Sequence, residues 1–550
     1  MRILSIQPFH DSTLAVINNG EIELFLKEER YTRKKRDKYS FKSIFLAAEY
    51  LKKHDKKVDY YCISAPVDHP YCEYLDIHLQ KLFGCKKYHH EPTHHLCHAS
   101  LAFYNSGFEK SLVVVIDRNG STIENYMREV ESVFLAEYPC NFRPLYKNHS
   151  LINRGEDLDF RLFHSLASKG YDFSADSLMG IVKVYESATT LIGENPRENG
   201  KTMGLAAYGR NQDFEDFFYQ GVPRDNLFLQ GNFGKSSFPT VIHKKYLDKI
   251  TDLLEEKNCQ FYADYAYQVQ KQTQEQVLRL IEKYVEKTRI HKVCVTGGYG
   301  LNVVANEHYI KNLPSVEFYF EPLADDSGNS LGAAMYAYRE ITKNSRISKI
   351  SSTFFHGFNT DFDIPDGIFC SIQDIAILLS QQKSVAVYNS LAEAGPRALG
   401  NRSILFDARN PDAKKIVNRI KKREWYRPFA AAVIEEDLEK YFHNHGIKSL
   451  PFMTVSLQVK KDVEIPGVQH VDGSCRVQTV DRTQDHFYNL LLEFKKITKS
   501  SVLLNTSFNQ AGEALVETLD DAVKTFRDTD LDVLWFPEKN VMLKKSTNIE

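Results

Sequence analysis

Two histidines one helical turn apart, in the segment THHLCHA, are the first residues of this chain whose spacing suggests chemistry. On a helix, His94 and His98 would turn both imidazoles toward one side, where they can chelate a single ion. Asp117 ends the apolar run SLVVVID, and Asp326 lies in EPLADDSGNSLGAA, where small residues begin a helix. Strand ends are common positions for ligand-binding carboxylates. The alternative is that the two histidines are only polar residues of a helix surface or core.

Two imidazoles and two carboxylates form a mixed nitrogen and oxygen donor set, which suits iron(II), manganese or zinc. Open coordination positions would let such an ion act as a Lewis acid. A glycine-rich segment, TGGYGLN, follows a predicted strand and would let the backbone approach a nucleotide, with Asn302 as a donor and acceptor. Gly297, Gly298 and Gly300 could equally form only a turn.

A second group of candidate residues is cationic and lies among glycines and prolines rather than along one face of a helix. Residues 393–432 contain five of these cations, Arg397, Arg402, Lys421, Arg423 and Arg427. Arginine forks match the geometry of phosphate, so the cluster predicts a site for polyphosphate or carbamoyl phosphate, with nucleic acid as the competing interpretation. Further along the chain, the same site could receive Arg476 from DGSCRVQTV and the neutral donors Asn505, Ser507 and Asn509 from LLNTSFN.

Alternating strand and helix patterns would position these residues. The chain opens with ILSI, TLAVI and EIELFL, three predicted strands with a hairpin turn at Asn-Asn-Gly and a polar loop that contains His10 and Asp11. The apolar runs SLVVVID and HKVCVTGG are further strands, and a long helical pattern, YAYQVQKQTQEQVLRLIEKYVEK, precedes the second of them. This alternation predicts an α/β fold.

The chain is long enough for more than one domain. Its 550 residues exceed the roughly 250 to 300 at which a single core stops growing. The composition shifts to a polar stretch without periodicity near residues 343–364, after which a new helix and strand begin. We therefore predict a domain at 1–345, a linker at 346–364 and a second domain at 365–550.

The composition favours a cytoplasmic protein with small-molecule partners. Hydrophobic residues make up 43% and charged residues 26%, and the net charge of -2 gives no general field toward nucleic acid or a membrane. The first residues lack a signal-peptide pattern, and no apolar run approaches the roughly 20 residues that span a bilayer. Nine cysteines without a CxxC pair suit a reducing compartment. A homodimer is left open.

Taken together, the motifs resemble the NodU/CmcH carbamoyltransferase family, whose members carbamoylate hydroxyls of antibiotics and Nod-factor sugars. The similarity runs through nearly the whole chain. The matching segments, in family order, are FHDSTLAV, KEERYTRKK, HHLCHA, VVVID, GKTMGLAAYG, TGGYGLN, DDSGNSLGAA, GPRALGNRSILFDAR, KKREWYRPFAAAV, DGSCRVQTV and NTSFN.

This resemblance implies an N-terminal ASKHA (Kae1-like) domain followed by a C-terminal YrdC-like α/β domain. The YrdC-like domain would form carbamoyl adenylate from carbamoyl phosphate and ATP, with Mg²⁺ accompanying ATP as co-substrate. The Kae1-like domain would transfer the carbamoyl group to a hydroxyl of a small-molecule acceptor, with Fe(II) or another divalent metal on His94, His98, Asp117 and Asp326.

Further roles fall to residues outside the metal group, of which the motif match itself carries over only those that bind carbamoyl phosphate and ATP. His10 would deprotonate the attacking hydroxyl. The nucleotide would contact Gly297, Gly298, Asn302 and Lys35, although Lys35 could also belong to a solvated loop. Carbamoyl phosphate and ATP would be held by six residues of the C-terminal domain, Arg397, Lys421, Arg427, Arg476, Asn505 and Ser507.

The chain departs from the family pattern at several positions. Ser390 and Leu391 replace the usual Gly-Arg before the ExGPRALG motif, Arg118 follows Asp117 where glycine is usual, and Ala207 replaces the proline of GLAPYG. The alternatives to O-carbamoyl transfer are tRNA threonylcarbamoyladenosine synthesis and a catalytically impaired nucleotide-binding protein. The sequence leaves the acceptor unidentified.

Overall fold

A computed structural model describes residues 1–65, 70–123, 126–152, 165–166, 168–212, 214–229, 238–239, 260–351, 354–358 and 361–545. The chain divides into two compact units with mixed helices and sheets, which confirms the α/β class. The first unit is Met1–Phe9, Thr13–Glu23 and Ala47–Ile350, and the second is His10–Ser12, Leu24–Leu46 and Ser351–Glu550. The second unit therefore takes short pieces from the start of the chain.

The first sheet has the strand order β3-β2-β1-β4-β5 among the described residues. Its strands are β1 (Arg2–Gln7), β2 (Thr13–Asn18), β3 (Glu21–Lys27), β4 (Tyr60–Ile63) and β5 (Lys86–Lys87). β1 pairs antiparallel with β2 and parallel with β4. Asn19 and Gly20 both have positive φ, 52° and 89°, as the predicted Asn-Gly hairpin requires.

The second sheet of the first unit has the order β10-β9-β8-β6-β15-β16, with β7 paired to β8. Its central strand, β6, pairs antiparallel with β8 and parallel with β15, as β1 does with β2 and β4. The strand pairing around β6 thus repeats the pairing around β1. No repeat in the amino-acid sequence indicates this duplication. The strands are β6 (Lys110–Ile116), β7 (Thr122–Ile123), β8 (Met127–Glu137), β9 (Asn141–Leu151), β10 (Asp172–Ser177), β15 (Lys292–Thr296) and β16 (Glu317–Phe320).

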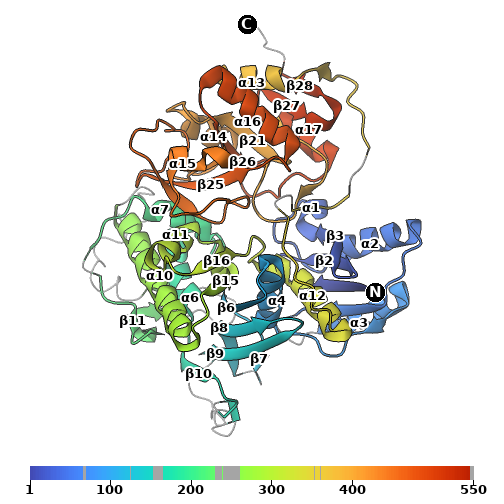
Figure 1. Cartoon of the computed structure of the whole chain (residues 1–550), viewed down its shortest axis with the longest axis vertical. Helices are drawn as coiled ribbons and strands as arrows, with labels where there is room; N and C mark the ends of the chain where they lie inside the picture. Colours follow the sequence, from blue (N-terminus) through green and yellow to red (C-terminus); the bar gives the residue numbers. More distant parts are fainter. Residues whose placement is uncertain are drawn as a thin grey trace. The chain divides into compact units, whose positions relative to one another are not determined.

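Helices α4 (His94–Ser106) and α12 (Asn329–Thr342) lie side by side between these sheets (Figure 1). A Cβ on Gly332 would stand 2.0 Å from the Cys97 carbonyl oxygen, so the two backbones approach closely because α12 is rich in small residues. The other helices with described ends are α2 (Phe41–Lys53), α3 (Pro70–Phe83), α6 (Ile181–Leu191), α7 (Asn199–Ala206), α10 (Gln260–Thr288) and α11 (Val303–Asn312).

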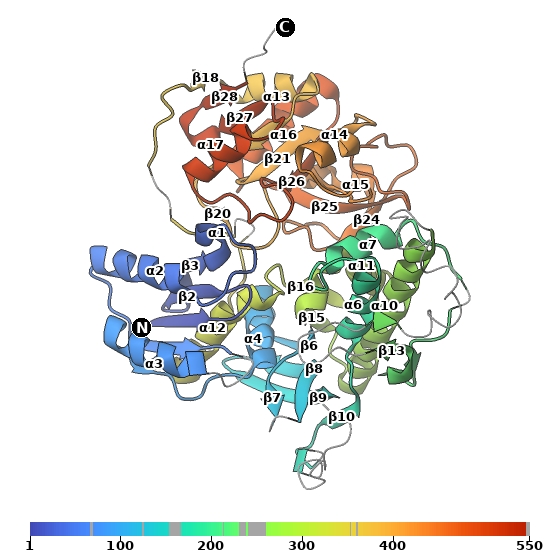
Figure 2. The same cartoon turned by 180° about the vertical axis from the view of Figure 1, so that it is seen from behind.

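The second unit is built on a ten-stranded sheet, in the order β18-β28-β27-β19-β21-β26-β22-β25-β24-β23 among the described residues (Figure 2). Helices α13 (Ile372–Ser380) and α16 (Asp485–Thr498) bury their apolar faces on this sheet around Trp535. The remaining helices are α1 (Glu28–Thr32), α14 (Ala413–Ile420), α15 (Leu438–Tyr441) and α17 (Leu519–Arg527). The strands are β18 (Ile368–Phe369), β19 (Val385–Val387), β21 (Ser403–Asp407), β22 (Ala430–Ile434), β23 (Phe442–His443), β24 (Ser456–Val459), β25 (Ser474–Val480), β26 (Val502–Ser507), β27 (Val533–Phe536) and β28 (Val541–Lys544).

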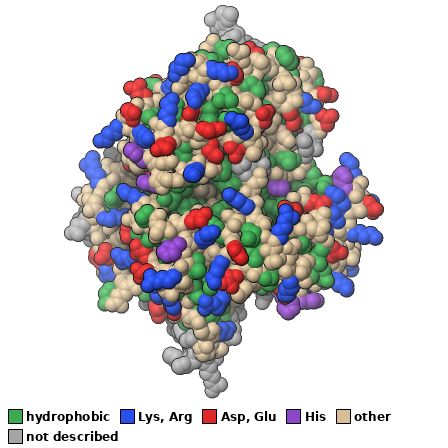
Figure 3. All heavy atoms as spheres, in the orientation of Figure 1, with side chains coloured by type: hydrophobic (Ala, Val, Ile, Leu, Met, Phe, Trp, Pro, Cys, Tyr) green, Lys and Arg blue, Asp and Glu red, His purple; other side chains and the backbone are tan. Residues whose placement is uncertain are grey.

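Acidic and basic side chains are interspersed on the face drawn in Figure 3, as a net charge of -2 leads one to expect. In the part of the chain that the structure describes, no helix combines the length and the apolar character needed to cross a membrane.

Candidate metal centre and anion site

Helix α4 places the two predicted histidine ligands on one face. Thr93 precedes the helix, and its side-chain oxygen accepts a hydrogen bond from the Leu96 N–H at 3.4 Å. The backbone N–H of His94 donates to Ser121 Oγ at 2.9 Å, which fixes the start of the helix. One turn later comes His98, and the Nε2 atoms of the two buried imidazoles are 3.2 Å apart. Local helix geometry therefore brings the two rings together.

Two carboxylates from other elements complete this group. Asp117 directly follows β6, and Asp326 begins the short 3-10 turn that leads into α12. The Nε2 atom of His94 is 3.5 Å from Asp117 Oδ2 and 3.4 Å from Asp326 Oδ1, and His98 Nε2 is 3.5 Å from Asp326 Oδ1. One donor atom from each of the four side chains lies within 4.8 Å of the others.

The geometry and the chemistry of this His/Asp group both suit a divalent ion. Metal bonds of about 2.0 to 2.2 Å in a tetrahedral site separate the donor atoms by roughly 3.4 Å, close to the distances found here. Burial opposes the charged imidazole, but Asp326 and Asp117 raise the pKa of His94 well above its ordinary value. Burial raises the pKa of Asp117, but its hydrogen bond with His94 and the charges of His98 and His94 together bring that pKa below its ordinary value. The two carboxylates thus stabilise a positive charge on the neighbouring imidazole. A bound metal ion could supply that positive charge instead.

Sequence reasoning missed Asn329 at the same place. Its Nδ2 atom lies 3.2 Å from His98 Nε2 and 3.3 Å from His94 Nδ1. Its Oδ1 has no hydrogen-bond partner among the described residues. Turning the side-chain amide of Asn329 over would direct its oxygen to the His/Asp group. The available signal was the position of Asn329, three residues after Asp326.

The TGGYGLN segment supports Asp117 rather than standing apart from the group. Gly297 has φ 80°, and a Cβ there would lie 2.4 Å from the Ile116 carbonyl oxygen. The adjacent Gly298 N–H donates to Asp117 Oδ1 at 3.0 Å. Asn302 caps α11, with its side chain accepting from the backbone at the start of the helix. Nucleotide contacts from Gly297, Gly298 and Asn302 stay a prediction.

The second unit gathers cations that lie far apart in the sequence. Burial lowers the pKa of Arg476 well below its ordinary value, and the charges of Arg397 and Arg427 lower it further. The pKa of Lys421 is lowered in the same way by burial and by neighbouring arginines. Like charges held together in a buried place are costly unless an anion joins them. We call this set the cation cluster, and its members are Lys35, Arg397, Lys421, Arg423, Arg427 and Arg476.

Neighbouring strands of the large sheet position part of this cluster. Arg476 of β25 and Asn505 of β26 both pair with Ala430 of β22, so they occupy adjacent places across three strands. The Asn505 amide donates to Gln478 Oε1 at 2.7 Å and to the Ala398 carbonyl at 3.2 Å. Nε of Arg476 and Oδ1 of Asn505 are buried and have no hydrogen-bond partner among the described residues. Such unsatisfied groups are suited to a polar ligand.

Lys421 joins α14 to the end of β26. Its Nζ donates to Ser507 Oγ at 3.2 Å, to the Asn509 carbonyl at 2.8 Å and to Asn509 Oδ1 at 2.9 Å, and it also contacts the Ser507 carbonyl. Lys421 and Ser507 are therefore together, as the sequence suggested. Asn509 belongs to the same group of contacts.

Arg402 has a different environment from the one its sequence position suggested. Its guanidinium is buried and donates to carbonyl oxygens of the chain, at 2.7 Å to Asn389 and 2.8 Å to Ser390. Its Cζ also lies 3.8 Å from the centre of the Tyr388 ring. Because backbone carbonyls accept from both Nη groups, while Nε is buried with no hydrogen-bond partner among the described residues, Arg402 stabilises the fold around the cluster rather than extending the cluster itself.

The remaining predicted residues fall in the short N-terminal pieces of the second unit. His10 lies in the β1–β2 loop, and its Nδ1 is 3.1 Å from Asp11 Oδ2. Lys35 belongs to Leu24–Leu46, and its charge acts on Lys421. The structure thus places Lys35 in the second unit and Gly297, Gly298 and Asn302 in the first. The base role of His10 stays a prediction.

Comparison with known families agrees with this pair of sites. The family model for the carbamoyltransferase N-terminus matches residues 67–335, and the one for the carbamoyltransferase C-terminus matches residues 376–545. The chain belongs to the carbamoyltransferase family. It is accordingly an enzyme that transfers a carbamoyl group, as the resemblance of its motifs predicted.

Relatives of this carbamoyltransferase include nodulation proteins. Nodulation protein NolO of Bradyrhizobium diazoefficiens is 28% identical, over 80% of this chain and 77% of that protein. Nodulation protein NolNO of Sinorhizobium fredii is 27% identical, over 96% of this chain and 78% of that protein. Among solved structures, full-length HypF in its phosphate- and nucleotide-bound form shares 14% identity with a TM-score of 0.38, over 62% of this chain and 56% of HypF. That likeness is too distant to bear on the assignment.

Proposed function

We propose that this carbamoyltransferase uses ATP and carbamoyl phosphate to modify a hydroxyl of a small-molecule acceptor. The second unit would form carbamoyl adenylate, with uptake of water and release of phosphate and pyrophosphate. The first unit would transfer the carbamoyl group to the acceptor oxygen and release AMP. The observation that carries the proposal is the cation cluster of the second unit, in which Lys421 is buried, since its members lower one another's pKa and include unsatisfied donors.

The cluster has the properties required for binding two phosphorylated substrates. Guanidinium groups bind phosphate oxygens in a bidentate way, and the ammonium of Lys421 adds a compact charge. Partial burial of the guanidinium groups and full burial of Lys421 strengthen these interactions because water screens them less. Asn505 and Ser507 would add neutral contacts beside Lys421 and Arg476. A triphosphate or carbamoyl phosphate would supply the negative charge that offsets the repulsion among the cations.

The His/Asp group of the first unit would serve the transfer step. His94, His98, Asp117 and Asp326 would hold Fe(II) or another divalent ion, which supplies Lewis-acid stabilisation of negative charge when bound. Gly298 would keep Asp117 oriented through its backbone N–H. His10 would accept the proton of the attacking hydroxyl, while the carbamoyl carbon exchanges its bond to the AMP oxygen for one to the acceptor oxygen.

Two substitutions test this division between the units. Arg427→Ala removes a guanidinium from the cation cluster, so it should abolish both pyrophosphate release and carbamoylated product. His98→Ala removes a donor from the His/Asp group, so pyrophosphate should still be released while the acceptor stays unmodified. Arg482→Ala and His90→Ala, both at exposed positions, are the matched controls.

Pyrophosphate release and carbamoylated product should be measured together for each variant, over a panel of sugar, nucleoside and aminoglycoside alcohols. Circular dichroism checks that each variant is folded. If folded His98→Ala stops pyrophosphate release as completely as Arg427→Ala, the division of the two steps is wrong. If the wild-type protein releases no pyrophosphate with carbamoyl phosphate and ATP, the activation step is wrong.

A further inference from the structure

The loop that carries Arg397 is closed at its ends by bonds between residues 389–391 and 401–402 and, inside these, by a buried carboxylate. It runs from β20 (Ala392–Glu393) to β21, and Glu393 stands at its beginning. Glu393 Oε1 accepts hydrogen bonds from three backbone N–H groups at the far end of the loop, those of Leu399 at 2.7 Å, Asn401 at 2.9 Å and Arg402 at 3.0 Å. Glu393 is only 2% exposed, so these bonds are protected from water.

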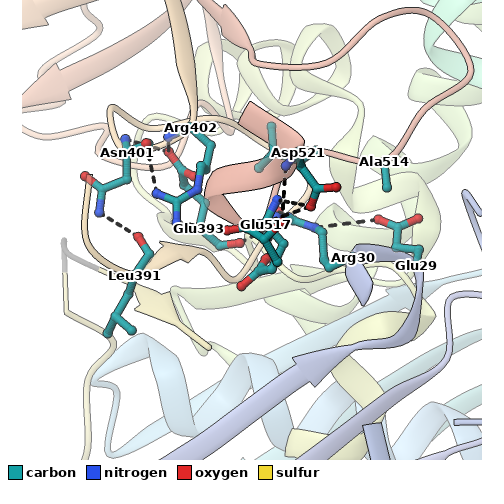
Figure 4. A network of polar contacts seen from close by, with 12 residues as sticks. Glu29, Arg30, Leu391, Glu393, Asn401, Arg402, Ala514, Glu517 and Asp521 are labelled. Atoms are coloured by element: carbon teal, nitrogen blue, oxygen red, sulfur yellow. Dashed lines mark hydrogen bonds and ion pairs between the residues drawn. The ribbon is translucent and has the colours of Figure 1, made fainter. Parts of the chain in front are cut away.

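A guanidinium from the N-terminal piece of the second unit contacts the same loop through its backbone. Arg30, on α1, donates from Nη2 to the carbonyl of Glu393 at 3.1 Å and to that of Gly395 at 3.2 Å. Its Nη1 is 3.6 Å from Glu517 Oε2, and the side chain is almost fully buried. Figure 4 shows Arg30 among Glu393, Glu517 and Asp521. Arg30 therefore holds the first residues of the loop while the Glu393 carboxylate holds the last.

The piece that carries Arg30 is itself firmly attached to the second unit. Arg33 donates from Nη1 to the Leu515 carbonyl at 2.7 Å and from Nη2 to the Ala514 carbonyl at 2.9 Å. Its Nε lies 3.4 Å from Asp521 Oδ1. These bonds attach the end of α1 to residues 514–521, so α1 can hold the loop in place.

Arg397 needs such a support because it lies within electrostatic reach of another cation. Its charge lowers the pKa of Arg476, so the two guanidiniums lie within electrostatic reach of each other. Repulsion between them would drive the loop outward if its ends were loose. Gln478 Nε2 donates to the Leu399 carbonyl at 2.8 Å, and the Asn505 amide donates to the Ala398 carbonyl. These bonds hold the residues just after Arg397, but neither closes the loop on itself.

We propose that Glu393 and Arg30 are positioning residues that clamp the 394–402 loop and so hold Arg397 in the anion-binding cluster. This role rests on the proposed function of the cluster. The carboxylate acts through its hydrogen bonds to backbone N–H groups, and Arg30 acts through backbone carbonyls. Neither residue is required to touch a substrate.

The test compares Glu393→Ala, which removes the acceptor, with Glu393→Gln, which keeps an amide oxygen in its place. Hydrogen exchange of the peptide spanning residues 394–402 reports the clamp without any substrate. Calorimetry with inorganic pyrophosphate reports the cluster, and pyrophosphate release reports the reaction. Glu538→Ala, at an exposed position in the same unit, is the control.

For Glu393→Ala we expect exchange in this peptide to accelerate at least tenfold and pyrophosphate affinity to fall about tenfold, with the KM for carbamoyl phosphate rising in parallel. Glu393→Gln should stay within about threefold of wild type in all three measurements. Wild-type exchange and affinity in folded Glu393→Ala would overturn the clamp. An equal loss in Glu393→Gln would do so as well, because charge rather than loop closure would then be responsible.

Arg30→Met keeps the test decisive if Glu393→Ala does not fold. It should weaken pyrophosphate binding while leaving the Glu393 bonds to Leu399, Asn401 and Arg402 in place, and unchanged affinity would count against the clamp. The two proposals can also fail separately. Faster exchange of the loop together with weaker pyrophosphate binding in Glu393→Ala supports the clamp even if the wild-type protein never converts ATP. Absence of ATP conversion would contradict only the proposed reaction.

Discussion

Arg402→Met should destabilise the second unit strongly although it changes no residue of the cation cluster. Arg402 is 1% exposed. It makes two short hydrogen bonds, at 2.7 Å to the Asn389 carbonyl and 2.8 Å to the Ser390 carbonyl. Two longer ones reach the Asn401 carbonyl at 3.1 Å and the Glu517 carbonyl at 3.3 Å. Methionine fills much of the same space but removes the donors of the Asn389 and Ser390 carbonyls, whereas the Asn401 and Glu517 carbonyls still accept from the Asn389 N–H and the Tyr388 hydroxyl.

The magnitude follows from these contacts. Two charge-assisted bonds at about 2 kcal/mol each, and two weaker ones at about 0.5 kcal/mol each, total about 5 kcal/mol. The contact of the guanidinium with the Tyr388 ring adds about 1 kcal/mol. Methionine avoids the cost of burying a guanidinium, which returns about 2 kcal/mol. We therefore expect a net loss of about 4 kcal/mol in the free energy of unfolding, or roughly 8 to 16 °C in Tm for a unit of this size.

Tryptophan fluorescence is a selective assay for this change. The chain has two tryptophans, Trp425 and Trp535, and both lie in the second unit. Urea and thermal unfolding followed by their emission therefore report that unit without interference from the first. Arg482→Met, at an exposed position of the same unit, should change stability by no more than about 0.5 kcal/mol. If Arg402→Met matches Arg482→Met, the reasoning from buried carbonyl acceptors is refuted.

Three further predictions concern the first unit. Burial raises the pKa of Glu321 to about 7 from 4.5, so the native state keeps a proton that the unfolded state has lost, and stability falls as pH rises between these values. Glu321→Gln should remove this slope, gaining about 3 kcal/mol relative to wild type between pH 5 and pH 8 by circular dichroism, and a pH-independent difference would contradict the assignment. Gly297→Ala should cost about 2 to 4 kcal/mol, because it combines positive φ with a backbone clash, whereas Gly193→Ala, with φ 77° and open space, should cost about 1 kcal/mol. Elemental analysis after anaerobic purification should find about one divalent ion per wild-type chain and none in His98→Ala, and equal metal content would exclude His98 as a ligand.

Local periodicity predicted those parts of the site that a single element determines. The one-turn spacing of His94 and His98 and the strand end at Asp117 could be interpreted from the sequence, and the structure brings their side chains together. The α/β class followed from alternating helix and strand patterns. By contrast, Arg402 could not be separated from Arg397 by sequence, since both lie in one polar segment. Whether an arginine side chain donates to backbone carbonyls or to a ligand depends on which carbonyl oxygens surround it in the folded chain.

Long-range pairing accounts for what the sequence could not supply. Nothing in KEERYTRKK shows that Arg30 contacts backbone near residue 393, because residues so distant in sequence leave no periodic signal. The duplicated strand order of the two sheets in the first unit is hidden for the same reason. Asn329 was overlooked because asparagine is common at helix starts, where it usually caps the helix rather than approaching a metal group.

The attachment of Leu24–Leu46 to the second unit constrains how this chain is made. Arg33 leaves the ribosome 482 residues ahead of Leu515, whose carbonyl it binds in the folded protein. At roughly 5 to 20 residues per second, translation needs about 25 to 100 s to supply that partner. The second unit cannot be completed before Leu515 has been synthesised, so the basic segment around Arg30 and Arg33 must wait in an open state until then. Nascent-chain profiling should therefore find this segment accessible to protease, or held by a chaperone, until the residues around Leu515 emerge from the ribosome.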